Sequence, residues 1–101
     1  EYPGVDIQGK PNMPVKTILN GIVVTITYLR GYGTTVIIDH GGGFYTVYSQ
    51  LKSLKTHVNS EVRSGDVIAH LAESNSENST ALHFEIWGDG EKLDPEKWLA
   101  K

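Results

Sequence analysis

Apolar and polar residues alternate along much of this chain, and that alternation predicts β-strands. The clearest case is residues 81–86, where apolar Leu82, Phe84 and Ile86 alternate with Ala81, His83 and Glu85. Side chains in a strand point to opposite faces in turn, so His83 and Glu85 are expected to share one face of this strand. Trp87 continues the series and is expected on the same face as His83 and Glu85.

Further strands are predicted at residues 5–7, 15–20, 21–29, 34–39 and 44–51, with glycine-rich turns between several of them. Residues 60–71 are expected to form a turn followed by a strand. Residues 15–20 and 21–29 are expected to pair with each other. At the C-terminus, Asp94 precedes Pro95, a pattern typical of the start of a helix, so one short helix is expected there. The predicted fold is all-β, with antiparallel sheets packed as an open barrel or sandwich around a concave face.

The composition narrows the class of protein. A chain of 101 residues allows one domain, and its net charge of −3 with a pI near 5.7 gives no reason to expect a nucleic-acid partner. No apolar run reaches the roughly 18 residues of a membrane-spanning helix. The absence of cysteine excludes a disulfide framework.

Three segments occur in a characteristic order: Gly4-Val5-Asp6-Ile7, Tyr45–Leu51 and Ala81–Ile86. They resemble the motifs H-x-G-x-D, Y-x-H-L and H-L-H-F-E of the LytM family of zinc peptidoglycan endopeptidases, peptidase family M23. The resemblance covers nearly the whole chain and implies a single LytM domain over residues 1–101. It also implies an exported protein of the periplasm or cell envelope, of which this domain is the C-terminal part.

The chain departs from the family pattern at three positions. Tyr2 stands where the family has its first zinc-binding histidine, Gln50 replaces the histidine of Y-x-H-L, and Ala81 replaces the first histidine of H-L-H. Of the three metal ligands that the resemblance implies, Asp6 and His83 remain.

These departures predict a domain without peptidase activity and without bound zinc. A catalytic zinc site normally has three protein ligands, and two hold the metal poorly. Tyr2 is a weak replacement, because a phenol must lose its proton before it can bind the metal. Gln50 and Ala81 cannot accept or donate the proton that general acid–base catalysis requires.

The resemblance implies a function as a regulator. Degenerate LytM domains of cell-division proteins bind and activate N-acetylmuramoyl-L-alanine amidases, which cut peptidoglycan. The degenerate groove is expected to contain Tyr2, Asp6, Tyr48, Gln50, Ala81, His83 and Glu85. Contacts with the amidase, another envelope protein or peptidoglycan are expected from Tyr32, Thr35, Tyr48, His83 and Trp87. An Asp6→Ala change is expected to matter little, because a ligand without a metal has no bond to lose.

Three alternatives remain open. The domain could be a scaffold module of the envelope that binds peptidoglycan or protein without activating an enzyme. It could be a working zinc endopeptidase with altered ligands, although three substitutions oppose that. Residues 62–71 also resemble biotinyl and lipoyl carrier domains, but residues 72–80 contain no lysine to take the cofactor.

Overall fold

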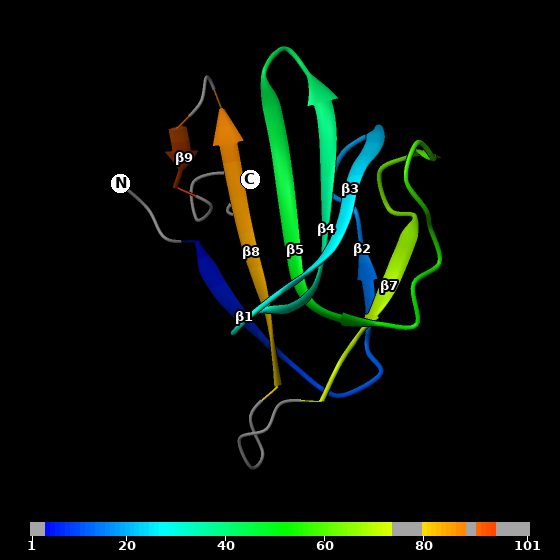
Figure 1. Ribbon diagram of the computed structural model, residues 1–101, viewed down its shortest axis with the longest axis vertical. Coiled ribbons are helices and arrows are strands. Elements are labelled where there is room, and N and C mark those ends of the chain that lie inside the picture. Colours follow the sequence, from blue (N-terminus) through cyan, green and yellow to red (C-terminus); the bar gives the residue numbers. More distant parts are fainter. Residues whose placement is uncertain (1–3, 74–79, 89–90, 95–101) are drawn as a thin grey trace.

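The computed structural model describes residues 4–73, 80–88 and 91–94, and this part of the chain contains nine β-strands and no helix (Figure 1). In chain order the strands are β1 (Val5–Gly9), β2 (Pro14–Lys16), β3 (Gly21–Leu29), β4 (Gly33–Gly41), β5 (Phe44–Lys52), β6 (Glu61–Val62), β7 (Val67–Leu71), β8 (Thr80–Gly88) and β9 (Glu91–Leu93). The predicted C-terminal helix after Asp94 lies outside the described residues.

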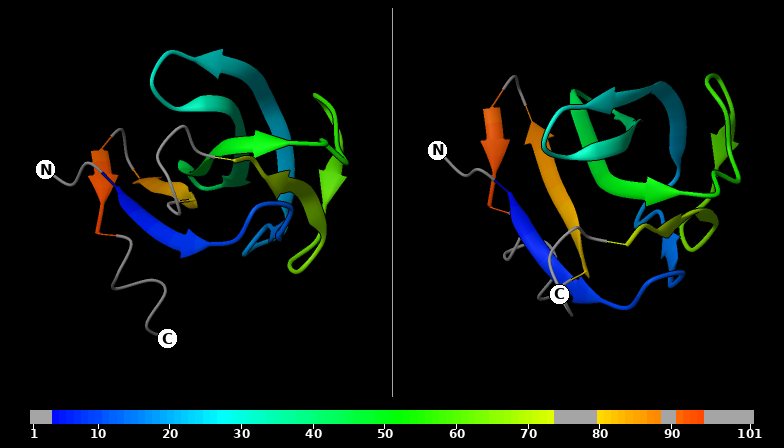
Figure 2. Two further views of the ribbon diagram at one scale, coloured as in Figure 1. Left: turned by 90° about the horizontal axis from the view of Figure 1, so that it is seen from below. Right: turned by 60° about the horizontal axis from the view of Figure 1, so that its bottom comes forward.

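All strand pairs are antiparallel, and the main path of the sheet runs β1-β8-β5-β4-β3-β6. β9 extends the β1 side of the sheet, because β1 pairs with the first half of β8 and β9 with its end. β7 pairs with the end of β5 and with β2. The sheet curves strongly, with β8 and β9 on one side of the molecule and β2 and β7 on the other (Figures 1 and 2). The predicted all-β antiparallel fold is confirmed.

One predicted strand pair is wrong. β2 ends at Lys16 and pairs with β7, whereas β3 pairs with β4 and β6. Thr17 explains the break, because its backbone N–H donates to the Asp66 carbonyl at 3.0 Å and its own carbonyl accepts from Gly65 N–H at 2.8 Å. These bonds tie residue 17 to the loop before β7, so the chain turns before it enters β3.

The hydrophobic core fills one face of the β4–β5–β8 sheet. Its buried side chains include Val36, Ile38, Tyr48, Phe84 and Ile86 from that sheet. The short strands cover it with Val15, Val62, Ile68, Ala69 and Leu71. Because successive side chains alternate, the other face of β5 and β8 is left to form a surface site.

Candidate functional site

The strand register brings the predicted site residues of β1 and β8 together. Asp6 lies opposite His83, and on the other side of β8 the pairs are Ser49 with His83, Val47 with Glu85 and Tyr45 with Trp87. Residues directly opposite each other in neighbouring strands point to the same face. His83, Glu85 and Trp87 therefore share the face away from the core, as the alternation of residues 81–87 predicts.

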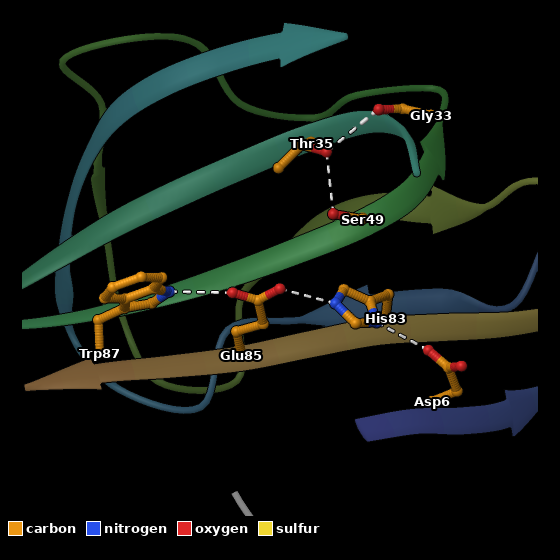
Figure 3. A network of polar contacts seen from close by, with 7 residues as sticks. All are labelled: Asp6, Gly33, Thr35, Ser49, His83, Glu85 and Trp87. Atoms are coloured by element: carbon orange, nitrogen blue, oxygen red, sulfur yellow. Dashed lines mark hydrogen bonds and ion pairs between the residues drawn. The ribbon is translucent and has the colours of Figure 1, made fainter. Parts of the chain in front are cut away.

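Four side chains on this face form a continuous chain of polar contacts (Figure 3). The Trp87 indole Nε1–H donates to Glu85 Oε1 at 2.9 Å, and Glu85 Oε2 lies 2.7 Å from His83 Nε2. His83 Nδ1 lies 2.8 Å from Asp6 Oδ1. The side chains of His83 and Glu85 are 14% and 13% exposed, whereas that of Asp6 is 67% exposed. This series of polar contacts therefore extends from the solvent-exposed Asp6 carboxylate to the largely buried Glu85 carboxylate.

Both ring nitrogens of His83 are occupied by carboxylate oxygens. A neutral imidazole has one N–H, so both contacts are hydrogen bonds only when the second nitrogen or one of the carboxyl groups carries a further proton. In this arrangement neither His83 nitrogen directs a free lone pair toward another ligand.

Tyr32 covers His83 from the turn between β3 and β4. The ring centroids are 4.7 Å apart with an interplanar angle of 43°, and Tyr32 is 45% exposed. The glycines on both sides have positive φ angles, 88° for Gly31 and 77° for Gly33, which residues with a Cβ rarely adopt. The Tyr32 carbonyl also accepts the Gln50 backbone N–H at 2.8 Å, which joins this turn to β5.

Beside this network lies a groove of about 450 Å³. Its walls are mostly apolar and are formed by Leu29, Tyr32, Ile37, Tyr45, Val47, Ser49, Glu85 and Trp87. Among the residues predicted to contact a partner, Tyr32 and Trp87 line it. Leu29, Ile37, Tyr45, Val47 and Ser49 are groove residues that the motif comparison missed, and the alternation of Tyr45, Val47 and Ser49 was the available signal.

The structure corrects the assignment of Tyr48 and Thr35 to the exposed groove surface. Tyr48 is 1% exposed and belongs to the core, where its ring lies 5.3 Å from that of Phe84. Thr35 is 0% exposed, and its hydroxyl bonds to Ser49 Oγ at 2.9 Å and to the Gly33 carbonyl (Figure 3). Thr35 therefore supports the groove from beneath, and Tyr48 lies on the opposite side of the sheet.

A β-bulge at Gln50 explains the difference between the predicted and the observed position of Tyr48. Ser49 and Gln50 together oppose Thr35, and Gln50 has a φ angle of 71°. The extra residue breaks the alternation, so Gln50 and Tyr48 do not have to share a face. The Gln50 side chain donates from Nε2 to the Glu73 carbonyl at 3.2 Å.

Of the remaining predicted groove residues, Ala81 lies within the described part of the chain. Ala81 lies on β8, half-buried and opposite Gln8 of β1, two residues before His83. Its methyl group can neither bind a metal nor transfer a proton. Tyr2 lies outside the described residues.

A second hollow, of about 830 Å³, lies at the start of β3 and the end of β4. It is lined partly by charged side chains, including Asp39, Glu61, Arg63 and Asp66. None of the predicted site residues lines it. The smaller groove is therefore the better candidate, because it adjoins the Asp6–His83–Glu85–Trp87 network.

Comparison with known proteins identifies the family. The sequence of residues 1–95 matches the protein-family model for peptidase family M23. The chain belongs to peptidase family M23. The family that the sequence motifs predicted, LytM/M23, is therefore confirmed.

Several curated relatives cover nearly all of the chain. It is 33% identical over 100 residues to the murein hydrolase activator EnvC of Escherichia coli K12, covering 99% of this chain and 24% of the relative. It is 33% identical over 97 residues to the murein hydrolase activator NlpD of the same strain, covering 95% and 25%. Outer membrane antigenic lipoprotein B of Haemophilus influenzae is 35% identical over 99 residues, with coverage of 97% and 24%. The chain thus spans about a quarter of each of these relatives.

Solved structures of M23 proteins share the fold. The catalytic domain of lysostaphin from Staphylococcus simulans superposes with a TM-score of 0.86 at 22% identity, covering 99% of this chain and 80% of that one. A putative M23 peptidase from Pseudomonas aeruginosa gives a TM-score of 0.84 at 23% identity, covering 95% and 43%. The expected LytM fold is therefore confirmed.

Peptidases of this family are normally zinc-dependent, but the described side chains do not fit a zinc ion. Within residues 4–73, 80–88 and 91–94, no group of three or more His, Cys, Asp or Glu side chains is placed to hold a metal. Both ring nitrogens of His83 are already in contact with carboxylates. The described ligand set therefore falls short of the three protein ligands of a catalytic zinc site.

Proposed function

We propose that this chain is a catalytically inactive LytM domain that binds and activates a peptidoglycan (N-acetylmuramoyl-L-alanine) amidase during cell-wall remodelling or division. The observation that carries the proposal is the apolar groove beside a remnant site whose histidine is held by two carboxylates. The chain's similarity to two murein hydrolase activators supports the same conclusion.

The side chains at the former reactive positions support the loss of catalysis. By resemblance, Gln50 and Ala81 occupy the positions of the two histidines that do not bind zinc in active members. An amide and a methyl group neither take up nor release a proton near neutral pH, so they supply no general base or acid. Asp6 and His83 bond to each other, and this replaces the metal as their shared partner.

The groove has the properties of a protein-binding surface. Tyr32 and Trp87 are large aromatic side chains on its wall, and aromatic anchors in a partly enclosed pocket contribute much of the energy of protein interfaces. Leu29 and Tyr45, which are 40% and 37% exposed, add apolar area that a partner would remove from water. The occupant that fits is an apolar segment of the amidase.

The proposed location is the periplasm or cell envelope, where both the amidase and its peptidoglycan substrate are found. One relative is named as an outer membrane lipoprotein, which supports this location. No helix long and apolar enough to cross a membrane occurs in the part of the chain that the structure describes.

Dye release from purified, dye-labelled peptidoglycan sacculi tests the function directly. The 101-residue chain alone is expected to release no dye, and a cognate amidase alone only a little. The mixture is expected to release several times more than the amidase by itself. Release by the chain alone would make it an enzyme. Pull-down of sacculi without any increase in amidase activity would favour the scaffold module instead.

Metal analysis tests the proposed absence of zinc. Protein purified without chelators is expected to contain far less than one zinc per chain, and His83→Ala should leave that content unchanged, because two ligands hold zinc poorly. A zinc-containing M23 peptidase prepared in parallel serves as the control. One zinc per chain that disappears on His83→Ala would overturn this expectation.

A further inference from the structure

The Trp87 indole has a defined orientation at the groove wall. An indole has a single N–H donor, and that of Trp87 is directed to Glu85 Oε1 at 2.9 Å. The ring also lines the apolar groove with Tyr45 and Val47. Anything that fixes the Glu85 carboxylate therefore also fixes the surface that a groove ligand meets.

The Glu85 side chain is also positioned by His83 and by the backbone of Gly4. Its second oxygen, Oε2, lies 2.7 Å from His83 Nε2. The backbone of Gly4, with a φ angle of 99°, lies so close that an added Cβ would be 2.7 Å from Glu85 Cγ. A largely buried carboxylate without polar partners is costly, so it remains where the Trp87 N–H and the His83 ring nitrogen reach it.

His83 is in turn fixed by Asp6. The Asp6 contact at 2.8 Å holds the ring nitrogen that faces away from Glu85, and Tyr32 covers the ring. Without Asp6, the His83 ring loses the polar contact that holds its Nδ1 atom. The expectation that Asp6 has no bond to lose is therefore wrong, because its partner is His83.

We propose that Asp6, His83 and Glu85 act as positioning residues that hold the Trp87 indole in the groove wall. Two former metal ligands and the glutamate of the third motif are thus reused to shape a docking surface. That the oriented indole meets the amidase rests on the proposed function, whereas the positioning itself is a property of the free domain.

The first test needs no partner. In ¹⁵N-labelled protein, the Trp87 indole N–H signal is identified by its loss in Trp87→Phe, and its hydrogen exchange is then measured. Asp6→Ala is expected to speed this exchange about three- to tenfold, as for the loss of one hydrogen bond. Asp6→Asn keeps an acceptor oxygen and should restore much of the protection.

Gln8→Ala is the matched control, because Gln8 is an exposed residue two positions along β1 on the same face as Asp6. It should leave the indole exchange unchanged. Backbone amide exchange in β8 should be equal in all variants, which separates positioning from general loosening of the sheet. Unchanged indole exchange in Asp6→Ala, or equal acceleration of the β8 amides, would overturn the proposal.

A double-mutant cycle then connects the network to binding of the cognate amidase. Asp6→Ala is expected to weaken binding a few-fold in the wild-type chain and to have no further effect in Trp87→Phe, which lacks the indole N–H. Equal weakening in both backgrounds would contradict coupling through the indole. If no variant binds the amidase, the proposed function fails, while the exchange measurement still decides the positioning.

Discussion

Tyr48→Ala is expected to lower the free energy of unfolding by about 3–5 kcal/mol, the usual cost of removing a buried aromatic ring. The ring is 1% exposed and packs against Phe84 in the core. Its hydroxyl accepts the Ile18 backbone N–H at 3.2 Å and bonds to Thr46 at 3.0 Å, so the substitution also leaves polar groups without a partner. Urea denaturation followed by circular dichroism measures the effect.

Two variants make this result specific. Tyr48→Phe keeps the ring and loses the hydroxyl, so it should cost about 1–3 kcal/mol. Tyr28→Ala removes a tyrosine that is 73% exposed and should change stability by less than about 0.5 kcal/mol. If Tyr48→Ala kept full stability and lost amidase binding, Tyr48 would have to be a groove residue after all.

Trp87→Ala is expected to weaken amidase binding by about 1–3 kcal/mol, roughly a five- to 150-fold rise in Kd. Trp87 and Tyr32 are the large aromatic side chains of the groove that also belong to, or cover, the polar network. Tyr32→Ala should therefore give a loss in the same range. Titration calorimetry with the purified amidase measures both.

Tyr28→Ala serves as the binding control as well. Tyr28 lies on β3 near the turn that carries Tyr32, but it does not line the groove. It should bind like the unsubstituted chain. Thermal melts of each variant must show a folded domain before its Kd is compared. If folded Trp87→Ala and Tyr32→Ala both bind with unchanged Kd, the amidase uses a different face.

The opposite expectations for Tyr48 and Trp87 follow from the strand register. The sequence places a tyrosine and a tryptophan in motif segments, and either could be a core residue or a binding residue. Tyr48 lies opposite Phe84, which points into the core, whereas Trp87 lies opposite Tyr45, which lines the groove. Pairing between distant segments thus decides which aromatic side chain a partner can reach.

Local patterns were sufficient where a segment is rich in β-branched residues or alternates between apolar and polar residues. The β-branched run of residues 21–29 and the alternation of residues 81–86 predict strands, and β3 and β8 include them. The predicted pairing of residues 15–20 with residues 21–29 is wrong for a reason that no local pattern reveals. Residue 17 bonds to the loop at 65–66, and this long-range contact redirects the chain.

The sequence by itself determined the all-β class and the family, because these depend on residue identity and spacing. It also predicts, from the family resemblance, that Tyr2, Gln50 and Ala81 stand in place of histidines. Only the tertiary structure decided which face of β5 forms the groove, since the bulge at Gln50 breaks the two-residue period. It also decided what Asp6 and His83 do. They are 77 positions apart in the chain, and only the pairing of β1 with β8 brings them to 2.8 Å.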